Sequence, residues 1–356
     1  MAIELSNLTF TEQDDIVPMS GVEEIRNTGI ANTLAGNDII IGTSDGNGGS
    51  GIYSQGNINT GDGDDIITGT NTSGIGYGYG IFNGFGMPDE VARTTLDTGD
   101  GNDTITGIGT FAIMNYATIN TGEGADSIIG DASSNNGPGE GIINVGTINT
   151  GNDEDSIISH GKIINYGGVF LGDSNDSITA DTDFPNRALE NFGFIGTGDG
   201  NDIITSTGII YNEDVIETGN GDDSIVVDGG IDDITGTTYS IYNNGGAINM
   251  GDGNDSIIAN EGFESAENSS GAWFLGEGDD YIKGYGSGDF YGGNGNDTLE
   301  LTPGTYTVGI WGEGGESPIF TKGDQLMITS EFEKLKAGST IYDFSSLTAG
   351  QIIIVA

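Results

Sequence analysis

The stretch Thr98–Thr106, TGDGNDTIT, decides the fold of this 356-residue chain, because copies of it recur along most of the sequence. Three other close copies are TGDGDDIIT (Thr60–Thr68), TGDGNDIIT (Thr197–Thr205) and MGDGNDSII (Met250–Ile258). Seven looser copies begin at Thr33, Thr121, Thr150, Leu171, Thr218, Leu275 and Gly292. Recurrence of one short phrase every few tens of residues is typical of a solenoid made of stacked coils.

Two positions of the phrase hardly vary among its eleven copies: the sixth residue is always Asp, and the eighth is Ile in ten copies and Leu in the last. The aspartates are Asp38, Asp65, Asp103, Asp126, Asp155, Asp176, Asp202, Asp223, Asp255, Asp280 and Asp297. A glycine-rich turn that enters a short strand with an inward eighth residue explains both positions. We therefore predict an all-β, right-handed parallel β-solenoid (β-roll or β-helix) with about one such turn per coil.

A second phrase, as in GIINVGTIN (Gly141–Asn149), precedes most of these turns and predicts another strand pair with an asparagine at its corner. Equivalent asparagines are Asn115, Asn144, Asn165, Asn191 and Asn212, with Asn27, Asn83 and Asn268 as further candidates. Stacked asparagine side chains can bond backbone groups that a tight corner leaves unpaired, so we expect a structural role for them.

The composition excludes several classes of protein. Glycine contributes 66 residues and hydrophobic residues only 34%, which argues against a large conventional core. With 8 basic and 55 acidic residues the formal charge is −47, so nucleic acid and anionic membranes are excluded as electrostatic partners. The chain has no cysteine, which excludes disulfides and zinc–thiolate sites. Such a composition also fits a disordered chain, but the periodicity argues against disorder.

The predicted stack requires a cation. Stacked coils bring the motif aspartates to about 5 Å from one another, where two charges repel by about 1 kcal/mol in water and about 3–4 kcal/mol at an effective dielectric of 20. Eight Lys and Arg residues are too few to compensate the column. Calcium fits because it accepts carboxylate and carbonyl oxygens in flexible geometry, whereas magnesium needs strict octahedral geometry and zinc prefers His and Cys.

The copy GGNGNDTLE (Gly292–Glu300) matches the nonapeptide GGxGxDxUx, and the chain resembles the bacterial RTX (repeats-in-toxin, haemolysin-type) calcium-binding family. The resemblance implies several Ca²⁺ ions, on the order of ten, held between successive turns by the eleven aspartates and by loop carbonyls. The implied glycines are Gly61, Gly63, Gly99, Gly101, Gly122, Gly124, Gly198, Gly200, Gly219, Gly221, Gly251, Gly253, Gly276, Gly278, Gly293 and Gly295. Leu34, Asp153 and Ser174 depart from the glycine pattern. Since most coils carry one such turn, we expect a single row of ions along one edge.

Three regions are predicted: an N-terminal cap (residues 1–24), the calcium-binding solenoid (25–300) and a C-terminal region (301–356). The last loses the period, and we expect it to cap the sheets and to contain the uncleaved type I secretion signal that the resemblance implies. The N-terminus lacks the features of a Sec signal, and no apolar run is long enough to span a bilayer.

The leading functional hypothesis is a secreted or cell-surface-associated structural solenoid that folds on binding extracellular Ca²⁺, with end-to-end assembly of copies left open. One alternative is an adhesin that binds a cell-surface glycan through aromatics such as Tyr116, Tyr166 and Phe192. Another is a glycan-acting enzyme, which we disfavour because His160 is the sole histidine and no zinc or nucleophile motif is present. Mixed ninth-position residues argue against ice binding. We do not expect an enzyme.

Overall fold

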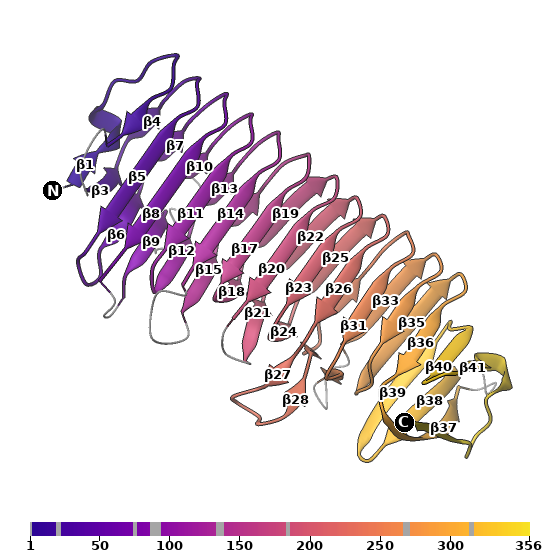
Figure 1. Cartoon of the computed structure of the whole chain (residues 1–356). Coiled ribbons are helices and arrows are strands. Elements are labelled where there is room, and N and C mark those ends of the chain that lie inside the picture. Colours follow the sequence, from indigo (N-terminus) through magenta and orange to yellow (C-terminus); the bar gives the residue numbers. More distant parts are fainter. Residues whose placement is uncertain are drawn as a thin grey trace. The chain divides into compact units, whose positions relative to one another are not determined.

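A computed structural model describes residues 2–18, 23–73, 77–85, 94–132, 139–182, 186–265, 271–312 and 317–356. The chain contacts define two compact units, the first comprising residues 1–184 and 188–197 and the second residues 185–187 and 198–356. Each unit is a parallel β-solenoid with three sheets, which confirms the predicted fold class (Figure 1). No helix in the described ranges is long and apolar enough to cross a membrane.

In the first unit, the coils contribute strands to three parallel sheets, called here the first, second and third sheet. Each coil gives one strand to each sheet except the first coil, which gives no described strand to the second sheet. The first sheet contains β1 (Ala2–Glu4), β3 (Glu24–Asn27), β6 (Ser50–Ser54), β9 (Tyr79–Asn83), β12 (Phe111–Asn115), β15 (Glu140–Asn144), β18 (Lys162–Asn165) and β21 (Arg187–Asn191). The second contains β4 (Ile30–Asn32), β7 (Asn57–Asn59), β10 (Thr95–Asp97), β13 (Thr118–Asn120), β16 (Thr147–Asn149), β19 (Gly168–Asp173) and β22 (Phe194–Asp199). The third contains β2 (Ile16–Val17), β5 (Ile39–Ser44), β8 (Ile66–Asn71), β11 (Thr104–Ile108), β14 (Ser127–Asp131), β17 (Ser156–His160) and β20 (Ser177–Asp181). A short 3₁₀ helix, η1 (Leu5–Asn7), follows β1.

The second unit repeats this plan. Its first sheet contains β24 (Ile209–Asn212), β29 (Ile241–Asn243) and β32 (Phe263–Ser265). Its second contains β25 (Val215–Asn220), β30 (Ala247–Asn249), β33 (Ala272–Glu277), β35 (Gly288–Asn294), β39 (Gln325–Ser330), β38 (Ser317–Lys322), β37 (Gly304–Trp311) and β42 (Ile352–Val355). Its third contains β23 (Ile203–Ser206), β26 (Ser224–Val227), β31 (Ser256–Ala259), β34 (Tyr281–Lys283), β36 (Thr298–Leu301), β40 (Lys334–Ala337) and β41 (Thr340–Asp343). A hairpin of β27 (Gly230–Ile231) and β28 (Thr238–Tyr239) and the 3₁₀ helix η3 (Phe344–Ser346) complete the unit.

Register explains why the eighth motif position is aliphatic. In the third sheet of the first unit, the eighth residues of successive copies are direct partners and form one buried column: Ile40, Ile67, Ile105, Ile128, Ile157 and Ile178. In the second unit the column is Ile204, Ile225, Ile257, Ile282 and Leu299, continued by Leu335. Burying each such side chain stabilises the fold by about 1.5–3 kcal/mol, so the stacked columns supply the core.

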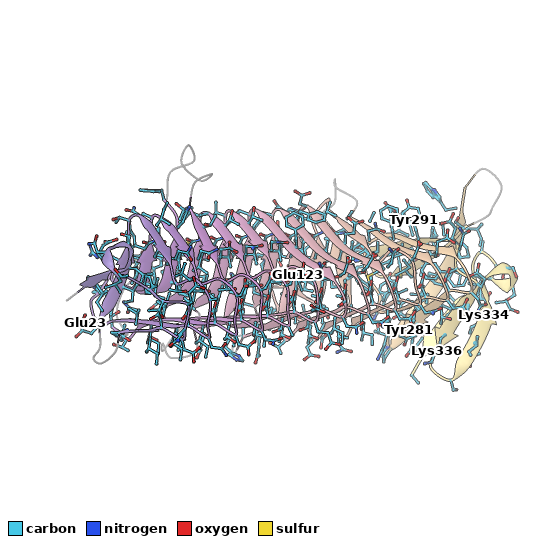
Figure 2. All side chains as sticks on the ribbon, turned by 90° about the horizontal axis from the view of Figure 1, so that it is seen from above. Glu23, Glu123, Tyr281, Tyr291, Lys334 and Lys336 are labelled. Carbon is cyan, nitrogen blue, oxygen red and sulfur yellow. The ribbon has the colours of Figure 1, made fainter. Side chains whose placement is uncertain are left out.

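The C-terminal strands combine two kinds of pairing. β39 and β40 continue the solenoid in parallel with β35 and β36. In contrast, β37, β38, β41 and β42 add antiparallel pairs at this end of the second unit. Lys334 and Lys336 lie on β40 in this region (Figure 2), and they form ion pairs with Asp343 and Glu300. The antiparallel strands therefore form a cap on the parallel sheets of this unit.

The corner asparagines form a ladder of side-chain hydrogen bonds. In the first unit each Nδ2 donates to Oδ1 of the next coil at 2.8–2.9 Å, along Asn83, Asn115, Asn144, Asn165 and Asn191. In the second unit Asn212 donates to Asn243 at 3.0 Å. Nδ2 of Asn115 also donates to the carbonyls of Ala117 and Thr147, so the ladder pairs corner backbone groups. Ser54 replaces asparagine between Asn27 and Asn83, and Asn268 lies outside the described residues.

Candidate metal centre

The glycine-rich turns connect the second sheet to the third and depend on left-handed backbone. All sixteen glycines predicted as site residues have φ between +93° and +151°, a region that side chains with a Cβ rarely adopt. Close approach adds a second requirement, because a Cβ on Gly99 would lie 2.0 Å from the Gly61 carbonyl oxygen of the preceding coil. Gly101 is equally close to Gly63. Glycine is therefore required at both positions by conformation and by space.

The three departures from the glycine pattern keep the same backbone. Leu34 (φ 82°), Asp153 (φ 78°) and Ser174 (φ 98°) adopt the left-handed conformation although they carry side chains. Such conformations cost roughly 1–3 kcal/mol and persist only where the surroundings enforce them. The stack therefore imposes one turn shape on every copy of the motif.

The sixth-position aspartates lie inside the turns, and all eleven are at most 2% exposed. One carboxyl oxygen, Oδ1, accepts the backbone N–H of the aspartate in the preceding coil at 2.7–2.9 Å. In the first unit this ladder runs from the Asp15 N–H through Asp38, Asp65, Asp103, Asp126 and Asp155 to Asp176. In the second unit it runs from the Asp202 N–H through Asp223, Asp255, Asp280 and Asp297 to Oε2 of Glu333.

The second carboxyl oxygen of nine aspartates is the unusual feature of these turns. Oδ2 is buried and has no hydrogen-bond partner within the described part of the chain. The nine are Asp38, Asp65, Asp103, Asp126, Asp155, Asp223, Asp255, Asp280 and Asp297. Buried polar atoms are nearly always paired. The same unpaired oxygen in nine turns therefore indicates that each turn binds a cation or a hydrogen-bond donor from outside the chain.

One turn without glycine behaves differently. Asp15 begins the ladder of the first unit, and its strand β2 pairs with β5. Its Oδ2 accepts the backbone N–H of Thr11 at 2.7 Å. The unpaired oxygen is thus a property of the glycine-rich turns and does not follow from membership of the aspartate ladder.

Burial also changes the acidity of these carboxyl groups. It raises the pKa of Asp65, Asp103, Asp126, Asp155, Asp223, Asp280 and Asp297 to about 6 and that of Asp255 to about 8. Burial raises the pKa of Asp38 in the same direction. At Asp65 the Thr60 hydroxyl and the Asp38 N–H lower the pKa again, while the carboxyl groups of adjacent coils add to the rise. At Asp255 a backbone N–H lowers the pKa, and the carboxyl groups of adjacent coils again raise it. The fold therefore disfavours the ionised carboxylate relative to water, and a positive group would offset this cost.

The donors in the interior of each turn are one buried carboxylate and main-chain oxygens. Within the described ranges no three Asp, Glu or His side chains converge on a point. The carbonyls of the first and third positions already accept hydrogen bonds, as Thr60 and Asp62 do from Thr33 and Gly36, but a carbonyl oxygen has two lone pairs. The turns bring each predicted aspartate next to its predicted glycines, and the carbonyl ligand set remains a prediction.

A row of fifth-position residues was not predicted from the sequence. In the first unit, Asn37, Asp64 and Asn102 each accept, through side-chain Oδ1, the N–H of the fifth residue in the next coil, ending at Ala125. In the second unit the row is Asn201, Asp222, Asn254, Asp279 and Asn296. The sequence signal that could have predicted this row is that the fifth position of the motif is mostly Asn or Asp. These side-chain hydrogen bonds link adjacent turns on their exposed side.

Comparison with known proteins gives a structural likeness but no match in sequence. No protein-family model matches the chain, and no curated protein matches it. A solved structure to which the chain is similar is the crystal structure of a hyperactive, Ca²⁺-dependent, β-helical antifreeze protein from an Antarctic bacterium. The two chains are 18% identical, the TM-score is 0.49, and the match covers 95% of this chain and 96% of the other.

Proposed function

We propose that this protein is a calcium-binding structural solenoid of RTX-like type, which is secreted or associated with a cell surface and folds on binding extracellular Ca²⁺. The observation that carries the proposal is the buried, unpaired Oδ2 of the motif aspartate, repeated in nine glycine-rich turns. A bound cation would compensate a buried carboxylate oxygen that has no partner in the chain.

The cation must come from outside the chain. In the described part of the chain, Lys and Arg side chains form ion pairs with Glu24, Glu190, Asp232, Asp343 and Glu300. None of the nine aspartates with an unpaired oxygen takes part in these pairs. With 55 acidic and 8 basic residues, the sequence has few further cations to offer.

Calcium suits the donors that the turns present. It takes six to eight oxygen ligands at flexible geometry, from carboxylates and backbone carbonyls alike. In this protein the motif aspartates would supply the carboxylate and the glycine-rich loops the carbonyls, while the ion would offset the charge of the column. Extracellular modules bind calcium at about 10⁻⁴ to 10⁻³ M, so the ordered state would form after export.

A calcium titration of the full chain, followed by circular dichroism, tests the proposal. Starting in chelator at low ionic strength, we expect a cooperative rise of the β-sheet signal as free Ca²⁺ passes the range of about 10⁻⁴ to 10⁻³ M. Magnesium at the same concentrations serves as the control and should be much less effective, because it resists loss of its water ligands. An identical folded spectrum in chelator and in calcium contradicts the proposal.

A further inference from the structure

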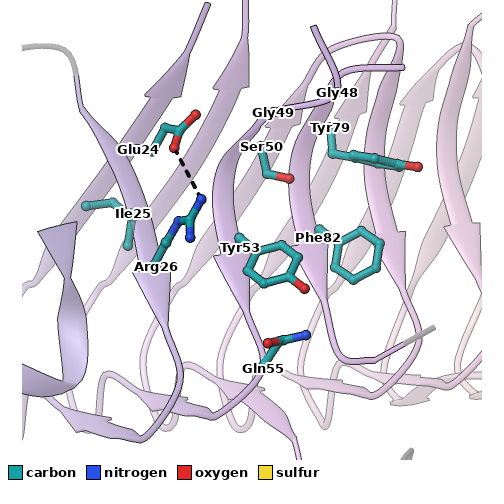
Figure 3. Close-up of a pocket in the computed structure, with 10 residues that line it drawn as sticks. All are labelled: Glu24, Ile25, Arg26, Gly48, Gly49, Ser50, Tyr53, Gln55, Tyr79 and Phe82. Carbon is teal, nitrogen blue, oxygen red and sulfur yellow. Dashed lines mark ion pairs between the residues drawn. The ribbon is translucent and has the colours of Figure 1, made fainter. Parts of the chain in front are cut away.

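A cleft of about 420 Å³ lies on the outer face of the first sheet in the first unit (Figure 3). Arg26, Tyr53 and Phe82 line it from β3, β6 and β9, where they are direct register partners. Tyr79 and Gln55 lie to either side of this row (Figure 3). The cleft and the glycine-rich turns lie on different parts of each coil. The cleft is on the first sheet, whereas those turns join the second sheet to the third.

The aromatic side chains form a platform and a wall. Tyr53 and Phe82 are stacked side by side, with ring centroids 5.3 Å apart and an angle of 23° between the rings. Tyr79 meets Phe82 edge-on, with centroids 5.3 Å apart and an angle of 80°. All three side chains are only partly buried and line the cleft, while Phe82 also contacts Tyr116 and Tyr79 also contacts Phe111. Such surface favours a ligand with a flat apolar face.

Polar groups stand at the edge of this platform. Arg26 is 58% exposed and pairs with Glu24 at 3.9 Å. Glu24 is fixed from the other side by the Ser44 hydroxyl, which donates to its Oε1 at 2.8 Å. A guanidinium has five N–H donors, so this single long contact leaves Arg26 able to donate to a ligand. The Gln55 amide offers both a donor and an acceptor in the same cleft.

The charges favour a neutral ligand. Arg26 and Glu24 cancel within the cleft, whereas the whole chain carries −47 and repels anions. A cation held over the rings would meet the guanidinium of Arg26. A ligand with an apolar face, hydrogen-bonding edges and no charge matches this surface. We propose that the cleft binds a neutral carbohydrate, with one sugar ring on Tyr53 and Phe82 and its hydroxyl groups against Arg26, Glu24 and Gln55.

Isothermal titration of the calcium-loaded full chain with cellohexaose, maltohexaose and chitohexaose tests this site. We expect saturable binding of at least one probe, weakened at least tenfold, or about 1.4 kcal/mol, by Tyr53→Ala and by Phe82→Ala. Tyr53→Phe should bind like the original chain. The matched control is Tyr166→Ala, which removes an outward ring stacked on Phe192 at 5.0 Å, away from the cleft, and should leave binding unchanged.

Three outcomes overturn the inference: no saturation by any neutral probe up to about 10 mM, binding confined to polygalacturonate or choline, or equal weakening by Tyr166→Ala. Circular dichroism of each variant in calcium shows whether it has folded. Tyr53→Ala and Phe82→Ala test the same platform separately, so either one keeps the test valid if the other does not fold. Circular dichroism measures calcium-dependent folding, and the heat of isothermal titration measures carbohydrate binding. The two proposals can therefore fail independently.

Discussion

The turn at residues 10–15 and the turn at residues 60–65 have the same length, and each ends on an aspartate followed by a strand of the third sheet. In both, the N–H of that aspartate donates to Oδ1 in the next coil at 2.7 Å. They differ inside the turn. Thr11 donates its N–H to Oδ2 of Asp15, whereas Oδ2 of Asp65 has no partner in the described chain.

The difference teaches what the glycines accomplish. The first turn has Thr11 and Gln13 where the second has Gly61 and Gly63, at φ of +96° and +141°. Left-handed glycine changes the direction in which the backbone amides point, and no amide of the turn bonds the second carboxyl oxygen. The glycine-rich turn thus lacks the internal hydrogen bond to the second carboxyl oxygen that the terminal turn forms. The terminal turn pairs its second carboxyl oxygen with its own amide, whereas the proposed calcium sites all lie in the repeated turns.

The strongest test of this contrast replaces equivalent residues in the two turns. A Cβ at Gly63 would lie 2.1 Å from the Gly36 carbonyl oxygen, and its φ is +141°. We expect Gly63→Ala to lower the free energy of unfolding in saturating calcium by about 3 kcal/mol. Gln13→Ala, the matched change in the terminal turn, should cost less than about 0.5 kcal/mol. Urea denaturation measures both, and similar losses would break the comparison.

Removing the carboxylate charge gives the next largest effect. Asp103→Asn keeps an Oδ1 acceptor for the Asp65 N–H but replaces the unpaired oxygen with an amide group. We expect a loss of at least one bound calcium ion in isothermal titration and about 2 kcal/mol of stability in calcium. Asp15→Asn should leave the number of ions unchanged and cost less than about 1 kcal/mol. An equal loss of ions in both variants would contradict the assignment of the site to the glycine turns.

The smallest effect has the opposite sign. Leu34 holds a left-handed φ of 82° in a turn where other copies have glycine, and its side chain is partly exposed. Leu34→Gly should relieve strain and raise stability by about 0.5–1 kcal/mol after the entropy cost of glycine is subtracted. Ala35→Gly, at the adjacent position without positive φ, should lower stability by a similar amount. Thermal unfolding in calcium measures both, and destabilisation by Leu34→Gly would show that strain is not what distinguishes this turn.

The solenoid and the position of the motif aspartates could be predicted because the same local phrase dictates both in each coil. An aliphatic eighth residue must face the core, and an acid two residues earlier then falls inside the turn. The terminal ladder members Asp15 and Glu333 were missed, because their turns lack glycine and only the register reveals their equivalence. Asn243 was missed for a similar reason, since its phrase is degenerate. The cleft could not be predicted, because its residues come from three coils and meet only through strand register.

The aspartate ladder has a direction within each unit. Every N–H in it points to the coil that follows in sequence, and in the second unit the last one is met by Glu333. A stack cut back from its C-terminal side would leave an amide hydrogen that water must accept, whereas one cut back from its N-terminal side would leave a carboxyl oxygen to which water must donate. The two ends of such an array are chemically unequal. In the second unit a glutamate that contributes no glycine loop ends the ladder.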